Sequence, residues 1–129
     1  MTTRPAASGS SSLRPTRENR VRKRAEFLAV QSRGARVTGD CLVFILSRRS
    51  DDQPATRLGI TASRKIGGAV QRNRAKRLIR EGFRRVFQDL PSAIDIVVIV
   101  RRPLGERKLV DILGEWQRAL PQIRRKVSV

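Results

Sequence analysis

Basic side chains dominate the stretch from Ser63 to Leu90, SRKIGGAVQRNRAKRLIREGFRRVFQDL. Between Arg64 and Arg85 it holds nine Lys and Arg residues and a single acid, Glu81. Helices that face only solvent usually mix both signs, because ion pairs at i,i+4 stabilise them. Arginine outnumbers lysine here, and its planar guanidinium can bind a phosphate through two parallel hydrogen bonds. The stretch therefore predicts a surface that binds a polyanion.

Groups able to catalyse bond cleavage are scarce. The chain has no histidine and no tyrosine, and its carboxylates are scattered without the spacing of metal ligands. A stand-alone nuclease needs a general base or a metal cluster. The glycines at 67 and 68 do not form a Walker loop, because no Gly-Lys-Ser/Thr follows them. We therefore predict a binding protein with no catalytic residue and no metal ligand of its own.

The net charge points to the class of partner. The chain of 129 residues carries 29 Lys and Arg against 11 Asp and Glu, a formal charge of +18. Such a chain repels itself until an anion neutralises it, which favours nucleic acid as the partner. A membrane is the competing anionic surface. The longest apolar run, Ile96 to Val100, is far too short to span a bilayer, so we expect no membrane.

The N-terminal residues and the single cysteine indicate how the chain is organised and where it is located. Residues 1–12 are small and polar, so we expect a disordered tail followed by one nucleic-acid-binding domain over residues 13–129. The N-terminus lacks the apolar core of a secretory signal. Cys41, the only cysteine, lies in an apolar run and is expected to pack as a small hydrophobe. These features indicate a reducing, cytoplasmic location.

Hydrophobic periodicity predicts the elements that position the basic surface. Apolar residues recur from Ala75 to Leu90 at helical spacing, which places most of the cations on the opposite, wet face. Arg72 falls on the apolar side by phase but lies in the first turn, where a long side chain can reach water. A second helix is expected from Lys108 onward, with Trp116 in its core stripe and a kink or break at Pro121. A short first helix is expected over 24–32, and strands over 35–37, 41–46, 58–62 and 94–100.

This order of elements predicts an α+β fold with a single layer of sheet. A strand, the basic helix and another strand follow one another between Gly59 and Val100. Such a unit is typical of a parallel crossover.

The basic stretch also carries a long, specific motif. It reads Ser63-Arg64-Lys65-Ile66-Gly67, then Ala69-Val70, then Arg72-Asn73-Arg74-Ala75-Lys76-Arg77-Leu78-Ile79-Arg80-Glu81. This pattern resembles the arginine-asparagine-arginine signature of the bacterial ribonuclease P protein subunit. The similarity extends from about Leu13 to the last helix, leaving out only residues 1–12.

The resemblance implies a ribosomal-protein-like fold, with a sheet of about four strands, three helices and a left-handed crossover, an exception to the right-handed rule. It also implies that the protein assists a catalytic RNA subunit in removing the 5′ leader of precursor tRNA. One protein per RNA is expected, and Mg²⁺ bound mainly by the RNA would supply the chemistry.

The family's RNA-facing positions can be carried over to this sequence. The signature that contacts the catalytic RNA would fall on Arg64, Lys65, Arg72, Asn73, Arg74, Lys76, Arg77 and Arg80. The cleft that holds the single-stranded leader would be lined by Phe27, Ile45 and Thr61. Relatives often place a second aromatic where this chain has Gln31, and an aromatic can occur where it has Ile45, so weaker stacking is expected here.

Two other classes of function remain open on the sequence. A structural RNA-binding protein, such as a ribosomal component or an RNA chaperone, fits the charge equally well. A DNA-binding regulator of the helix-turn-helix type would need a second helix a short turn away. Strand-like runs flank the basic helix on both sides instead.

Overall fold

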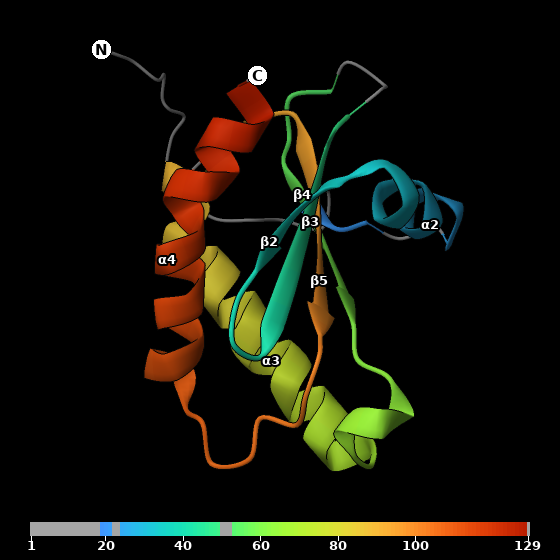
Figure 1. Ribbon diagram of the computed structural model, residues 1–129, viewed down its shortest axis with the longest axis vertical. Helices are drawn as coiled ribbons and strands as arrows, with labels where there is room; N and C mark the ends of the chain where they lie inside the picture. The colour runs from blue at the N-terminus through green and yellow to red at the C-terminus, as the bar shows by residue number, and fades with distance from the viewer. Residues whose placement is uncertain (1–18, 22–23, 50–52, 129) are drawn as a thin grey trace.

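A computed structural model describes residues 19–21, 24–49 and 53–128 of the chain. The predicted disordered tail, residues 1–12, lies outside the described residues. The elements follow one another as helix, three strands, the basic helix, a strand and a last helix (Figure 1). They are α2 (Arg24–Arg33), β2 (Ala35–Thr38), β3 (Leu42–Arg48), β4 (Arg57–Thr61), η2 (Arg64–Ile66), α3 (Ala69–Val86), η3 (Phe87–Asp89), β5 (Ile94–Val100) and α4 (Leu109–Ser128).

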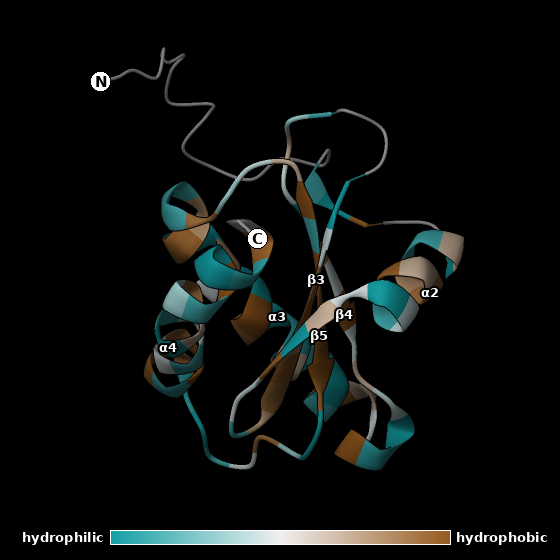
Figure 2. Ribbon diagram, turned by 45° about the horizontal axis from the view of Figure 1, so that its top comes forward, coloured by the Kyte–Doolittle hydropathy of each residue, from teal (hydrophilic) through white to brown (hydrophobic). Residues whose placement is uncertain are grey.

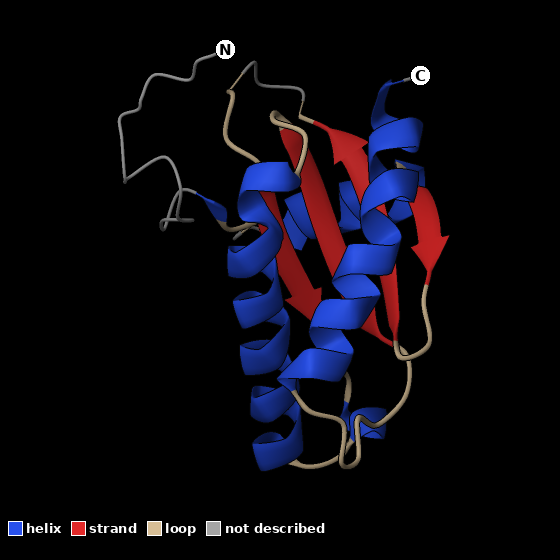
Figure 3. Cartoon of the chain, turned by 90° about the vertical axis from the view of Figure 1, so that its left-hand side faces the viewer, coloured by secondary structure: helices blue, strands red, loops and turns tan. Residues whose placement is uncertain are grey.

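The strands form one four-stranded sheet in the order β2-β3-β5-β4. β3 pairs antiparallel with β2 and with β5, whereas β4 pairs parallel with β5, with Gly59 opposite Val97. The predicted parallel crossover is therefore confirmed, and α3 is the helix that makes it. Seen from the side of α3 and α4, β5 lies to the right of β4 while both strands run downward (Figure 3). The crossover is thus left-handed, as the family resemblance implied.

Helices cover both faces of the sheet. α3 and α4 lie side by side on one face, and the short α2 lies alone on the other (Figures 1 and 3). Apolar residues concentrate on the strands and on the helix surfaces turned toward them (Figure 2). This is the predicted α+β architecture with a single layer of sheet.

The main core lies between the sheet and the pair α3 and α4. Trp116 is fully buried there, stacks edge-on against Phe44 with ring centroids 4.9 Å apart, and donates its indole N–H to the carbonyl of Ile79 at 3.2 Å. Its predicted place in the core is confirmed, and so is the burial of Cys41. Burial of such aromatic and aliphatic surface is the dominant stabilising contribution to a fold of this size.

The basic stretch is less continuous than the sequence pattern indicates. A single turn of 3-10 helix, η2, precedes α3, and the last residues before Pro91 form a second 3-10 turn, η3. A kink or break was expected at Pro121, and α4 continues through it without a break. Trp116, Leu120 and Ile123 are all buried, so packing on both sides of the proline compensates for the backbone hydrogen bond it cannot donate.

Candidate nucleic-acid interface

The exposed side of α3 carries a row of cations. Ala75, Ile79 and Phe83 face the core, so the helical repeat turns the opposite side of α3 toward solvent. Arg77 and Arg80 are exposed. Within the part of the chain that the structure describes, no carboxylate lies within ion-pair distance of the basic residues Arg72, Lys76, Arg77 and Arg80. Asn73, also exposed, completes this row.

Three other arginines of α3 have partners inside the protein. Arg74 donates hydrogen bonds to the carbonyls of Gly105, at 3.1 Å, and Arg107. It therefore ties α3 to the loop between β5 and α4, although the family resemblance assigns it to the RNA. Arg84 and Arg85 both pair with Glu81, at 2.6 and 3.0 Å.

The turn before α3 extends the basic surface. Arg64 and Lys65 belong to η2 and are exposed. The hydroxyl of Ser63 accepts a hydrogen bond from the Lys65 amide at 3.3 Å, which caps this turn. Ile66 is buried and anchors the turn to the core, so the two cations stand beside the first turn of α3.

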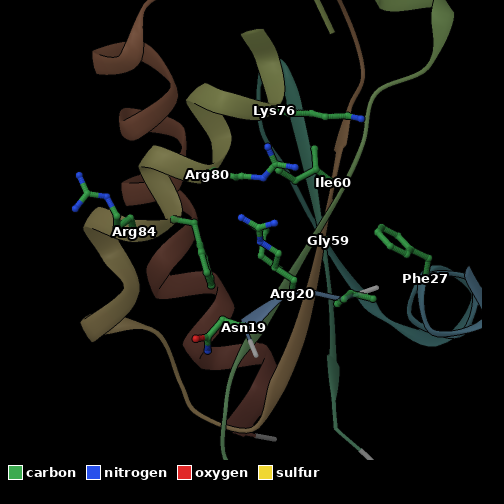
Figure 4. Close-up of a pocket in the computed structure, with 11 residues that line it drawn as sticks. Asn19, Arg20, Phe27, Gly59, Ile60, Lys76, Arg80 and Arg84 are labelled. Atoms are coloured by element: carbon green, nitrogen blue, oxygen red, sulfur yellow. The ribbon is translucent and has the colours of Figure 1, made fainter. Parts of the chain in front are cut away.

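A groove of about 480 Å³ runs along the outer edge of β4. Lys76 and Arg80 reach it from α3, Phe27 reaches it from α2, and Gly59 and Ile60 form its floor on β4 (Figure 4). Because alternate residues of a strand point to opposite faces, the groove passes around the sheet edge from one face to the other. Cations and two aromatic residues, the half-buried Phe27 and the buried Phe83, thus line the same concave surface.

Phe27 packs closely on Gly59. A Cβ atom added at Gly59 would lie 2.6 Å from Cε1 of Phe27, so only glycine lets the ring approach the strand this closely. Phe27 itself is half-buried and keeps part of its surface at the groove.

The other two residues assigned to the leader lie on the same face of the sheet as Phe27. Ile45 is fully buried, in a small cluster with Val30 beneath α2. In this conformation it supports α2 from below and offers no surface to a ligand. Thr61 is half-buried at the end of β4, paired in register with Ile99.

The sequence pattern missed one wall of the groove. Asn19 donates from its amide to the Thr56 carbonyl at 2.7 Å, and the Val21 amide donates to the Leu58 carbonyl at 3.0 Å. This short segment therefore runs beside β4, bridging at Arg20. Nothing in the local sequence pattern indicated that this segment would be fixed against β4.

A cluster of charges joins α2 to the sheet. Arg57 binds both carboxylate oxygens of Asp95, at 2.7 and 2.8 Å, and reaches Glu26 of α2 at 3.0 Å. Its side chain is 13% exposed and that of Asp95 8%. The hydrogen bond to Asp95 raises the pKa of the Arg57 guanidinium further above its usual value. Glu26 directly precedes Phe27, so this cluster also positions the aromatic wall of the groove.

One group of possible metal ligands forms only in three dimensions. Ligand atoms of Asp40, Cys41 and Glu115 lie within 4.8 Å of one another. Both oxygens of Glu115 accept backbone amides, from Cys41 at 2.9 Å and Leu42 at 3.3 Å, and Asp40 pairs with Arg107 at 3.0 Å. These carboxylates already satisfy amides and a guanidinium, which gives them a structural role.

The side chains that line the groove are not of the kind that binds Mg²⁺. Magnesium prefers carboxylate and phosphate oxygens, whereas the described lining of the groove contributes arginines, a lysine, an asparagine and apolar groups. These residues would therefore not hold the ion themselves. Among the described helices, none is long and apolar enough to cross a membrane.

The fold and this surface define a small α+β protein whose surface combines a row of cations with an aromatic-lined groove. The family model of ribonuclease P matches residues 16–124. The chain belongs to the ribonuclease P protein family. This family forms the protein component of the endoribonuclease that processes the 5′ end of tRNA, an enzyme that the protein builds together with an RNA subunit.

Individual relatives support the assignment along most of the chain. The ribonuclease P protein component of Gluconacetobacter diazotrophicus is 41% identical over 105 residues, covering 81% of this chain and 90% of the relative. That of Caulobacter vibrioides is 45% identical over 104 residues, covering 78% and 68%. Among solved structures, the protein from Thermotoga maritima aligns with a TM-score of 0.72 at 31% identity, covering 81% and 96%. The Staphylococcus aureus protein aligns with a TM-score of 0.71 at 30% identity, covering 84% and 96%.

Proposed function

We propose that the basic side of α3 docks on the catalytic RNA subunit, while the groove beside it receives the 5′ leader of precursor tRNA. The observation that carries this proposal is the row of cations on α3, which have no carboxylate partner among the described residues and adjoin a groove with an aromatic wall. We further propose one protein per RNA and a cytoplasmic location. The docking surface comprises Arg64, Lys65, Arg72, Asn73, Lys76, Arg77 and Arg80, with Arg74 as structural support that holds the neighbouring loop. The leader surface comprises Phe27, Thr61 and, as buried support, Ile45.

The contribution of the protein is electrostatic. Two folded RNAs repel each other, and cationic side chains replace part of the counterion screening that they need. Mg²⁺ held mainly by the RNA would supply the chemistry of phosphodiester cleavage. The row on α3 would then lower the concentration of free magnesium at which catalytic RNA and precursor associate.

Cleavage of precursor tRNA across a magnesium series tests this function. Catalytic RNA is assayed alone, with the protein, and with a second basic protein of similar charge. We expect leader removal at low magnesium only with this protein, and none by the protein without RNA. Cleavage by the protein alone would contradict the proposal. Equal stimulation by both basic proteins, combined with tighter binding to ribosomal RNA, would favour a general structural RNA-binding role instead.

The leader surface is tested by Phe27→Ala in the assembled complex. Stacking of a base on an aromatic ring contributes roughly 1 to 3 kcal/mol, whereas emptying a buried phenylalanine site costs about 3 to 5 kcal/mol of stability. Because Phe27 is only half-buried, we expect a moderate loss of stability and a smaller preference for precursor over mature tRNA. A large loss of stability with an unchanged preference for precursor over mature tRNA would show that Phe27 has a purely structural role.

A further inference from the structure

The short segment beside β4 presents one cation to the groove. Asn19 and Val21 are both buried, held by the hydrogen bonds to Thr56 and Leu58 described above. Side chains alternate along an extended segment, so Arg20 between them points outward. It is exposed and lines the groove.

Arg20 and Arg80 converge on the same space. Arg20 extends from the segment beside β4 toward Arg80, which extends from α3 over Ile60 (Figure 4). Partial loss of water on the groove side, and the like charge of Arg20, lower the pKa of the Arg80 guanidinium. The described lining of the groove contains no acid that would neutralise the pair. Two like charges held together in this way are stabilised by an anion between them.

The edge of β4 adds a polar floor. The Leu58 carbonyl accepts from Val21 on the outer side of the strand, and alternate residues direct their backbone groups to the same side. The N–H of Ile60, two residues further on, therefore points outward into the groove. Phe27 lies beyond it, against Gly59.

We propose that Arg20 and Arg80 form a clamp for one backbone phosphate of single-stranded RNA, placed so that a neighbouring base reaches Phe27. The clamp rests on the proposed function and deepens it, because it assigns Arg20 to the substrate strand and gives Arg80 a role there. A single strand supplies the phosphate better than a duplex does, since the two guanidiniums approach from opposite sides of a concave groove. The phosphates of a duplex lie on its convex outer surface.

Precursor tRNAs with one uncharged methylphosphonate linkage test the clamp. The linkage is moved one position at a time along the leader, and binding to the assembled holoenzyme is measured for wild type, Arg20→Gln and Arg80→Gln. Removing one charge from a charge-assisted hydrogen bond should weaken wild-type binding roughly tenfold at one leader position. Arg20→Gln and Arg80→Gln should bind the normal leader roughly tenfold more weakly and should be insensitive to the neutral linkage at that same position.

Arg36→Gln is the matched control, because it removes the same charge from β2, the opposite edge of the sheet. It should respond to the neutral linkage as wild type does. Thermal unfolding of each variant verifies folding, and Arg20→Lys, which retains the charge, should recover part of the affinity.

The outcomes separate the clamp from the function on which it rests. If the wild-type holoenzyme prefers precursor over mature tRNA but binds every neutral-linkage precursor as tightly as the normal one, the clamp is wrong and the proposed function is unaffected. Arg20→Gln that stays as sensitive as wild type at the critical position would also overturn it. Wild type without any preference for precursor would overturn the proposed function and the clamp together.

Discussion

Arginines of α3 with similar sequence surroundings have different roles. Arg74 donates to the carbonyls of Gly105 and Arg107 and so holds a loop, whereas Arg77, three residues on, is exposed. Helical phase explains the difference, since the two residues lie on neighbouring sides of α3 and only the side of Arg74 borders the loop between β5 and α4. The arginine-asparagine-arginine signature thus contains a structural arginine as well as solvent-facing ones.

Substituting these two residues one at a time should separate the roles. Arg74→Ala is expected to lower the free energy of unfolding by about 1 to 3 kcal/mol, because two carbonyls lose a charged donor. Arg77→Ala should leave stability unchanged and reduce the slope of log affinity for the catalytic RNA against log salt by roughly 0.7 to 0.9. Urea unfolding and binding across a salt series measure the two effects.

Arg118→Ala on α4 is the control for that pair, since it removes an exposed arginine from a different helix. An unchanged salt slope for Arg77→Ala would count against α3 as the docking surface. Unchanged stability for Arg74→Ala would show that water replaces its hydrogen bonds without loss.

The attachment of α2 decides the shape of the groove. Only Val30 of this helix is buried, and Phe27 is shared with the groove, so little apolar surface holds α2 to the sheet. The charges of Glu26, Arg57 and Asp95 supply the remaining contact. An ion pair this buried fixes geometry more reliably than it adds stability, because desolvation offsets much of the attraction.

Removing one partner of the Arg57–Asp95 ion pair should destabilise the protein, whereas replacing both partners with apolar residues should not. Arg57→Met is expected to lower the free energy of unfolding by about 3 to 5 kcal/mol, because the buried carboxylate of Asp95 loses its partner. The double variant Arg57→Met, Asp95→Leu should recover most of that loss. Chemical denaturation of the single and double variants measures the recovery. If the double variant is as unstable as Arg57→Met alone, the ion pair contributes to the free energy of unfolding beyond the neutralisation of each charge by the other.

The whole molecule carries far more positive than negative charge, at +18 over 129 residues. Several acids are already paired, among them Glu81, Asp40 and Asp95. The excess cations repel one another in the compact state, and the partner RNA relieves that repulsion.

Salt should therefore stabilise the free protein. We expect the midpoint of thermal unfolding to rise as sodium chloride increases from about 0.01 to 0.15 M, a range over which the Debye length falls from roughly 30 to 8 Å. Calorimetry at fixed pH measures the change. Glu81→Gln, which removes a negative charge, should steepen this dependence. A midpoint that falls with salt would mean that attractive ion pairs outweigh the net repulsion.

The amino-acid sequence by itself determined the elements and the identity of the basic helix. The apolar stripe from Ala75 to Val86 and the strand at Ile94–Val100 follow directly from local periodicity, because burial repeats with the geometry of each element. The signature on α3 likewise lies within one continuous stretch, so the resemblance to the ribonuclease P protein was visible without any tertiary contact.

The tertiary structure alone decided which side chains meet. Arg20 and Arg80 border one groove although 60 positions separate them, and Glu115 reaches the amide of Cys41 across 74 positions. Ile45 lies beneath α2, and its complete burial there depends on how that helix packs on the sheet. Periodicity reports which side of an element is buried, but the partner on that side depends on how distant segments pack. The groove arises from such packing, because α2, β4, α3 and the segment beside β4 each supply one wall.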